Sequence, residues 1–126
     1  MTVAFNHTIV WSTDRTAAAA FFADMYGLPA PEDLFRFKVV KVANGVSIDF
    51  ADREEAISPQ HYAFLVSEAE FDGILDRIKA RGITWWADPA RSKPGEINRN
   101  DGGRGVYFEG PDGHFFEALT VPYGGA

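Results

Sequence analysis

The feature that most limits how this chain folds is an internal repeat. Residues 6–11 (NHTIVW) align with residues 60–65 (QHYAFL) at an offset of 54 positions, which places His7 over His61. Both runs are apolar apart from a few polar positions and read as strands, and each is followed by a helical stretch. Equivalent strands of two similar units face each other across a pseudo-twofold axis. The two histidines are therefore expected to converge.

Each repeat copy carries signals for the start and the end of its helix. The first helix is preceded by Ser12-Thr13-Asp14, and Ser67 with Glu70 three positions later fits a capping box. Gly27 and Gly82 are expected to end the two helices. Apolar stripes at helical spacing are predicted at Ala17, Ala20, Phe21 and Met25 in the first helix and at Phe71, Ile74, Leu75 and Ile78 in the second.

Strand-like runs follow each helix. Those in the first half are residues 35–42 and 46–50, joined by an Asn-Gly turn, and those in the second half are residues 105–109 and 114–121, joined by an Asp-Gly turn. A short strand is expected at Trp85-Trp86, and its counterpart within residues 28–34 is weakened by two prolines. Residues 90–103 are polar and rich in Gly, Pro, Arg and Asn, which predicts a long loop.

Composition limits the classes of partner. A chain of 126 residues with 46% hydrophobic residues suits one domain, residues 1–126, with repeat units at about 3–52 and 59–122. A net charge of -6 disfavours nucleic acid and anionic membranes as partners. The start of the sequence has no leader pattern, so a soluble, cytoplasmic protein is expected. Without cysteine, any metal must be held by His, Asp or Glu.

Three polar residues interrupt three of the apolar runs. His7 and His61 lie on the repeated strands, and Glu117 lies on the run 114–121. Because side chains alternate along a strand, Glu117 shares a face with Phe115. An unpaired carboxylate on such a face costs several kcal/mol, by the general cost of burying a charge. Two imidazoles and one carboxylate form a ligand set for a divalent metal with open positions.

These residues resemble the vicinal oxygen chelate superfamily, which includes glyoxalase I, fosfomycin-resistance thiol transferases, extradiol dioxygenases and bleomycin-resistance proteins. The resemblance rests on Asn6-His7-Thr8, on residues 60–64 and most specifically on residues 105–117 (GVYFEGPDGHFFE). It implies an α+β fold of two βαβββ units forming a curved mixed sheet around a metal, with the helices on the outer face. His7, His61 and Glu117 fall on the superfamily's ligand positions, and many members are homodimers.

The resemblance also suggests a fourth ligand, Asp49, on the last strand of the first unit. Asp49 lies 42 residues after His7, whereas Glu117 lies 56 residues after His61. The difference of 14 equals the length of the segment 90–103, so Asp49 is the expected counterpart of Glu117. An aspartate reaches one bond less than a glutamate, and a charge at the edge of the sheet, near Arg53 or Lys41, is the alternative interpretation.

Further residues are candidates for contacts with a substrate. His114 is expected to be structural or exposed, because it adjoins a turn and points away from Glu117. Basic residues in and after the long loop favour an anionic substrate or are solvated loop charges, and aromatic residues line a pocket or belong to the core. The basic residues are Arg91, Lys93, Arg99 and Arg104, and the aromatic ones are Trp11, Trp85, Trp86 and Tyr107.

The first functional hypothesis is a metal-dependent, non-redox lyase, isomerase or transferase that acts on a small molecule. The divalent metal, which is Zn, Ni, Mn, Fe or Co, acts as a Lewis acid on substrate oxygens, and Glu117 serves as both ligand and catalytic residue. The same ligand trio also occurs in non-haem Fe(II) oxygenases, so a dioxygenase is an alternative. A metal-free binding protein for a drug or small molecule, as in bleomycin resistance, is the alternative from another class.

Overall fold

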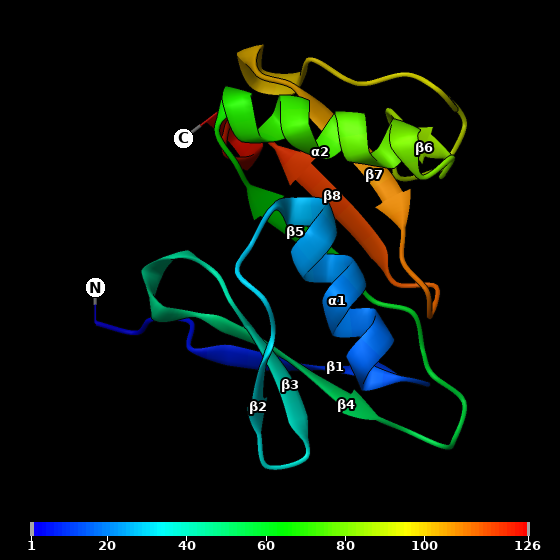
Figure 1. Cartoon of the computed structure of the whole chain (residues 1–126). Coiled ribbons are helices and arrows are strands. Elements are labelled where there is room, and N and C mark those ends of the chain that lie inside the picture. The colour runs from blue at the N-terminus through cyan, green and yellow to red at the C-terminus, as the bar shows by residue number, and fades with distance from the viewer. Residues whose placement is uncertain (1, 126) are drawn as a thin grey trace. The chain divides into compact units, whose positions relative to one another are not determined.

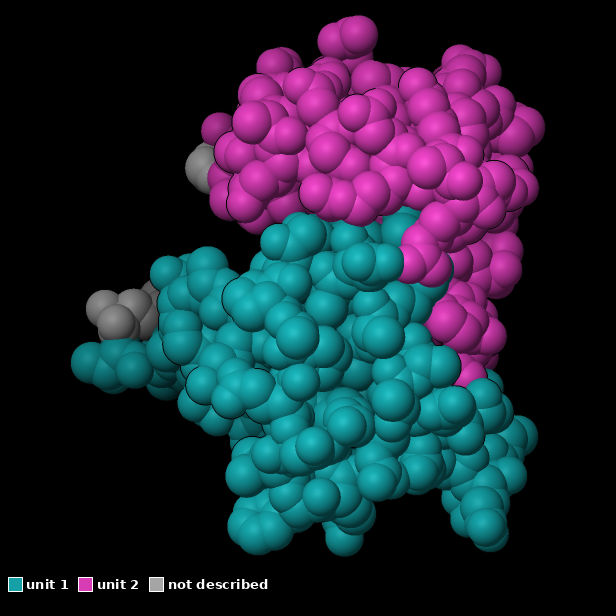
Figure 2. All heavy atoms as spheres, viewed as in Figure 1, with its two compact units in different colours: residues 1–58 teal, residues 59–126 magenta. Residues whose placement is uncertain are grey.

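The computed structural model describes residues 2–125 and divides the chain into two compact units, residues 1–58 and 59–126 (Figure 2). Each unit consists of one helix and one four-stranded mixed sheet (Figure 1). The predicted α+β class and the two βαβββ units are confirmed.

The first unit contains β1 (His7–Ser12), α1 (Arg15–Tyr26), β2 (Glu32–Leu34), β3 (Phe37–Lys41) and β4 (Ser47–Asp52). Its strand order is β1-β4-β3-β2, in which β1 and β4 are parallel and the other neighbours antiparallel. The turn between β3 and β4 places Asn44 at φ 65° and Gly45 at φ 72°. Asn and Gly tolerate this left-handed region best, so the sequence signal for a tight hairpin is confirmed.

The second unit contains β5 (His61–Leu65), α2 (Glu68–Ala80), β6 (Trp85–Trp86), β7 (Gly105–Glu109) and β8 (Phe115–Leu119). Its strand order is β5-β8-β7-β6, and β5 and β8 are the parallel pair. The two units therefore share one topology, as the repeat predicted. The long segment before β7 contains one 3-10 turn, Asn100–Gly102, and two isolated bridges.

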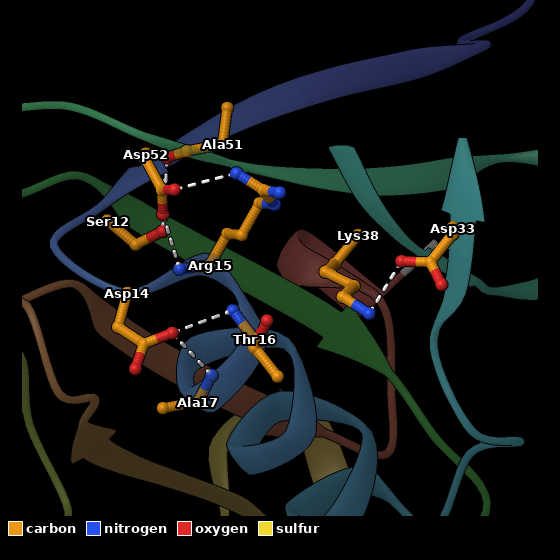
Figure 3. A network of polar contacts seen from close by, with 9 residues as sticks. All are labelled: Ser12, Asp14, Arg15, Thr16, Ala17, Asp33, Lys38, Ala51 and Asp52. Atoms are coloured by element: carbon orange, nitrogen blue, oxygen red, sulfur yellow. Dashed lines mark hydrogen bonds and ion pairs between the residues drawn. The ribbon is translucent and has the colours of Figure 1, made fainter. Parts of the chain in front are cut away.

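The start of α1 is fixed by two aspartates (Figure 3). Asp14 is the N-cap, and its Oδ1 accepts hydrogen bonds from the backbone N–H of Thr16 at 3.0 Å and of Ala17 at 3.2 Å. Asp52, at the end of β4, accepts one bond from the Arg15 backbone N–H at 2.8 Å and another from the guanidinium at 2.7 Å. The first helix is thereby tied to the strand that carries Asp49.

The buried face of α1 differs from the predicted stripe. Ala17 and Ala20 are exposed and Phe21 is half-buried, whereas Met25 is buried as expected. The face that packs on β3 and β4 consists of Ala18, Ala19, Phe22, Ala23, Met25 and Tyr26. Residues 17–23 are all apolar, so their sequence contains no polar position that marks the solvent side.

The second helix follows its sequence signals closely. Ser67 Oγ accepts from the Glu70 N–H at 3.1 Å while the Glu70 carboxylate accepts from the Ser67 N–H at 2.8 Å, which is the predicted capping box. Phe71, Ile74 and Ile78 are buried against the sheet, and Leu75 is half-buried. Among residues 2–125, no helix is long and apolar enough to span a membrane.

Candidate functional site

The alternation along β8 determines which face carries the candidate chemistry. Phe116 and Ala118 are buried on the side of α2, so Phe115, Glu117 and Leu119 occupy the opposite face. In register with Glu117 are Ala63 on β5 and Tyr107 on β7. Glu117 is only 8% exposed, so its carboxylate needs partners that replace water.

One of these partners is His61. Its Nε2 lies 3.0 Å from Oε1 of Glu117, and its Nδ1 lies 3.0 Å from the backbone oxygen of Phe115. The two residues come from neighbouring parallel strands, where His61 is in register with Phe115. Two of the residues predicted as metal ligands, His61 and Glu117, are therefore in contact within the second unit.

The positions of the hydrogens on the His61 ring follow from whether each neighbouring oxygen can donate or only accept a hydrogen bond. The Phe115 carbonyl only accepts, so Nδ1 of His61 carries a hydrogen and donates it. In the neutral imidazole, Nε2 is then a lone pair directed at the carboxylate oxygen of Glu117. A proton or a metal cation between these two atoms removes the repulsion. A histidine whose other nitrogen donates to a carbonyl is the usual arrangement for a metal ligand, so the residues fit a divalent metal.

Tyr107 is the second partner of Glu117. Burial raises the pKa of its hydroxyl to about 12, with further contributions from the charge of Glu117 and from their hydrogen bond. The phenol is therefore protonated at neutral pH and donates to the carboxylate. Its ring stacks on His61, with centroids 5.9 Å apart. Tyr107 thus contacts both members of the pair. It was expected from the sequence only as a pocket wall.

His7 occupies the equivalent position in the first unit. Its Nδ1 lies 2.7 Å from Oδ1 of Asn6, so in the neutral imidazole Nε2 is the nitrogen with the lone pair. Both repeat histidines therefore have Nδ1 held by an oxygen. The orienting role of Asn6 was not predicted, although the amide residue before each histidine was a visible signal.

Asp49 is the structural counterpart of Glu117, as the register argument predicted. Asp49 pairs with Ile9 on β1, just as Glu117 pairs with Ala63 on β5. Its side chain is buried and accepts a hydrogen bond from Ser47 Oγ at 2.8 Å. Asp49 thus has one hydrogen-bond partner on its own strand, and its role as a fourth ligand stays a prediction.

Among residues 2–125, no three His, Asp or Glu side chains lie close enough together to hold a metal ion. The ligand set His7, His61 and Glu117 therefore stays a prediction.

The three candidate tryptophans lie in different places: Trp85 and Trp86 point to opposite faces of the second sheet, and Trp11 lies on β1 of the first unit. Trp86 lies on the Glu117 face, where its ring centroid is 5.8 Å from that of Phe115. Trp85 lies towards α2, with the Lys79 ammonium 5.8 Å from its ring. In the first unit, Trp11 is partly exposed, and the Arg53 guanidinium lies 5.4 Å from its ring.

Arg104 is held by the second helix. Its guanidinium donates to Glu68 Oε1 at 2.8 Å, pairs with Asp72 at 2.8 Å and lies over the ring of Phe71. Hydrogen bonds and ion pairs with Asp72 and Glu68 raise its pKa further. Arg104 also lines a small pocket with Tyr107, Glu117 and Leu119. Its predicted contact with a substrate stays a prediction.

Of the two roles expected for His114, structural or exposed, the structure shows the structural one. It is buried, and its Nδ1 accepts a hydrogen bond from the Gln60 backbone N–H at 3.0 Å. Its ring meets Tyr62 edge-on at 5.7 Å, on the side of the sheet away from Glu117.

Comparison with known proteins places the fold and the site in context. No protein-family profile matches the chain. The solved structure of Oxidase ChaP-H1 is 57% identical, with a TM-score of 0.96, over 98% of this chain and 100% of that one. Oxidase ChaP-H2 is 56% identical, with a TM-score of 0.95 and 98% coverage of both chains.

More distant relatives carry the superfamily's names. Glutathione transferase FosA of Serratia marcescens is 24% identical over 123 residues, which are 93% of this chain and 80% of that protein. The fosfomycin resistance protein FosX of Listeria monocytogenes is 24% identical, with a TM-score of 0.73 and 98% coverage of both chains. The chain belongs to the vicinal oxygen chelate superfamily. The chain belongs to the same family as Oxidase ChaP-H1 and Oxidase ChaP-H2.

Proposed function

We propose that this chain is a metal-dependent oxidase of the vicinal oxygen chelate superfamily, with His7, His61 and Glu117 as the metal ligands. The observation that carries the proposal is the His61–Glu117 pair, in which an imidazole nitrogen and a carboxylate oxygen lie 3.0 Å apart. Redox chemistry is favoured by the 57% identity to Oxidase ChaP-H1 along nearly the whole chain. The sequence alone had placed a non-redox reaction first and an Fe(II) enzyme as an alternative.

A bound divalent metal supplies a Lewis acid to the substrate and, if it is Fe(II), a route for electrons to dioxygen. The protein's own residues prepare the site. The Phe115 carbonyl holds the His61 ring so that Nε2 is available, and Asn6 does the same for His7. Tyr107 donates to the Glu117 carboxylate and keeps it oriented. Phe115 and Trp86 beside the pair provide an apolar surface that excludes water.

The proposal is tested first by metal content. Protein purified without chelator and dialysed against Fe(II), Mn(II), Ni(II) or Zn(II) is expected to hold one ion per chain. Binding is expected to be lost in His61→Ala, Glu117→Ala and His7→Ala. Glu109→Gln is the matched control, because Glu109 lies on the same face at the end of β7 and is not a proposed ligand. Wild-type protein that binds none of these ions refutes the metal centre and leaves the metal-free binding function.

The redox part is tested separately in an oxygen electrode. The Fe(II)-loaded protein is expected to consume dioxygen with the substrate of Oxidase ChaP-H1, the first compound to try, and the Zn(II)-loaded protein is expected not to. Turnover with both ions and without oxygen uptake supports the second candidate, a non-redox transferase, which the sequence similarity to glutathione transferase FosA favours.

We also propose that the chain acts on a small molecule as a homodimer in the cytoplasm, in line with the sequence resemblance. Sedimentation equilibrium at micromolar concentration checks the dimer, and a mass of one chain contradicts it.

A further inference from the structure

Arg91 lies on the aromatic surface next to the His61–Glu117 pair and is not used by the proposed function. Its guanidinium carbon is 4.3 Å from the ring centroid of Phe115 and 5.1 Å from that of Trp86, both cation–π distances. The Phe115 ring in turn lies 6.0 Å from the His61 ring. One aromatic ring therefore separates a fixed positive charge from the candidate metal pair.

The turn that carries Arg91 is held in an uncommon conformation. Arg91 has a φ of 60°, in the left-handed region that a residue with a Cβ adopts only at a cost. The Asp88 carboxylate accepts hydrogen bonds from the backbone N–H groups of Ser92 and Lys93. The Ala87 N–H donates to the Lys93 carbonyl at 3.1 Å, which ties the turn to the end of β6. These bonds keep Arg91 over the rings.

Most of the hydrogen-bonding capacity of Arg91 is free for a ligand. Within residues 2–125, its side chain has one hydrogen bond, from Nη1 to Oε1 of Glu109 at a long 3.4 Å. A guanidinium that stacks on a ring by its face keeps its N–H groups in the plane and directed outwards. The Arg91 side chain is 40% exposed, and a planar carboxylate is the partner that such a fork binds in two places.

We propose that Arg91, Trp86 and Phe115 form a binding site for a planar aromatic ligand that carries a carboxylate or a similar planar anionic group. The anionic group accepts hydrogen bonds from the guanidinium, and the ligand's ring contacts the half-buried residues Trp86 and Phe115. Glu109 competes with the ligand for the same guanidinium. This proposal names a substrate class for the site of the proposed function and rests on that function.

The test compares 2-naphthoate with its neutral analogue 2-naphthamide by isothermal titration calorimetry. The whole chain of 126 residues is used after treatment with a chelator, so the result does not depend on a bound metal. Wild type is expected to bind naphthoate about tenfold more tightly than naphthamide, the effect of a half-exposed hydrogen bond to a charged group. Arg91→Ala is expected to remove this preference, and Arg91→Lys, which lacks the planar fork, to retain only part of it.

Glu109→Gln provides a change of opposite sign. Loss of the competing carboxylate is expected to strengthen binding of naphthoate and to leave that of naphthamide unchanged. Arg36→Ala, in the first unit, is the matched control, because the Arg36 guanidinium also lies over a ring, that of Phe37, and the substitution is expected to change neither affinity. Circular dichroism checks that each variant is folded.

The proposal is overturned if naphthoate and naphthamide bind equally, if Arg91→Ala keeps the preference, or if neither compound binds at millimolar concentration. Metal content is measured on the same preparations before chelation. A protein that binds metal but shows no Arg91-dependent preference loses this proposal and keeps the proposed function. A protein that shows the preference but binds no metal keeps this proposal and loses the proposed function.

Discussion

Replacing Tyr107 with phenylalanine tests whether its hydroxyl prepares Glu117 for a metal. The hydroxyl is buried and its pKa is raised to about 12, so it donates to Glu117 throughout the neutral range. Phenylalanine keeps the ring that stacks on His61 and on Phe115. The substitution therefore removes one hydrogen bond and leaves the aromatic surface in place.

The expected magnitude follows from the charge of the acceptor. A hydrogen bond to a charged group contributes about 1.5–3 kcal/mol, and loss of an outer partner of a metal ligand weakens metal binding about 10–100-fold. A tenfold change corresponds to about 1.4 kcal/mol. Tyr107→Phe is thus expected to raise the dissociation constant for the metal by at least about tenfold.

Mn(II) titration calorimetry at pH 7 measures this constant. Tyr62→Phe is the matched control, because Tyr62 stacks on Phe116 on the opposite face of the same sheet. Its metal affinity is expected to equal that of wild type. The reasoning is refuted if Tyr107→Phe binds Mn(II) as tightly as wild type does, or if Tyr62→Phe weakens binding equally.

Three further predictions concern folding and are measured by urea unfolding. Phe108 is 0% exposed and its ring centroid lies 5.7 Å from that of Phe116, so Phe108→Ala is expected to lower the free energy of unfolding by about 3–5 kcal/mol. Phe35→Ala, at a site 91% exposed, should change this free energy little, and equal losses in the two variants contradict this account of the core. Ser67→Ala removes the capping box and is expected to cost about 1 kcal/mol, and an unchanged midpoint argues against the cap. Hydrogen bonds from Ser67 lower the pKa of Glu70 from 4.5, so the ionised carboxylate stabilises the folded state fully above about pH 4.5, and this stabilisation is lost as the pH falls through the lower folded pKa. The loss of unfolding free energy in Glu70→Gln should therefore shrink on acidification, and a loss that grows contradicts the assignment.

Much of the fold follows from local signals in the sequence. The Asn44-Gly45 turn, the capping box and the two terminal glycines each have a single favourable conformation, so the boundaries of most elements were predicted within a few residues. The buried face of α1 was predicted wrongly, because residues 17–23 are uniformly apolar and only packing on β3 and β4 selects the inner side.

The candidate site was predictable to the extent that it depends on strand periodicity. Alternation along the strand placed Glu117 on the face opposite Phe116, and the repeat identified Asp49 as the residue at the equivalent position of the first unit. The cation–π contact of Arg91 with Phe115 was not predictable, because it depends on the conformation of a loop whose sequence has no periodicity. The contact of Tyr107 with Glu117 depends on the cross-strand register of β7 and β8.

The central proposal is that His7, His61 and Glu117 are the ligands of the metal ion. Pulsed EPR of the Cu(II)-loaded protein tests it most directly, since the modulation from remote imidazole nitrogens counts the bound histidines. The account predicts two imidazoles in wild type and one in each of His7→Ala and His61→Ala. A wild-type spectrum with a single imidazole, unchanged in His7→Ala, contradicts it.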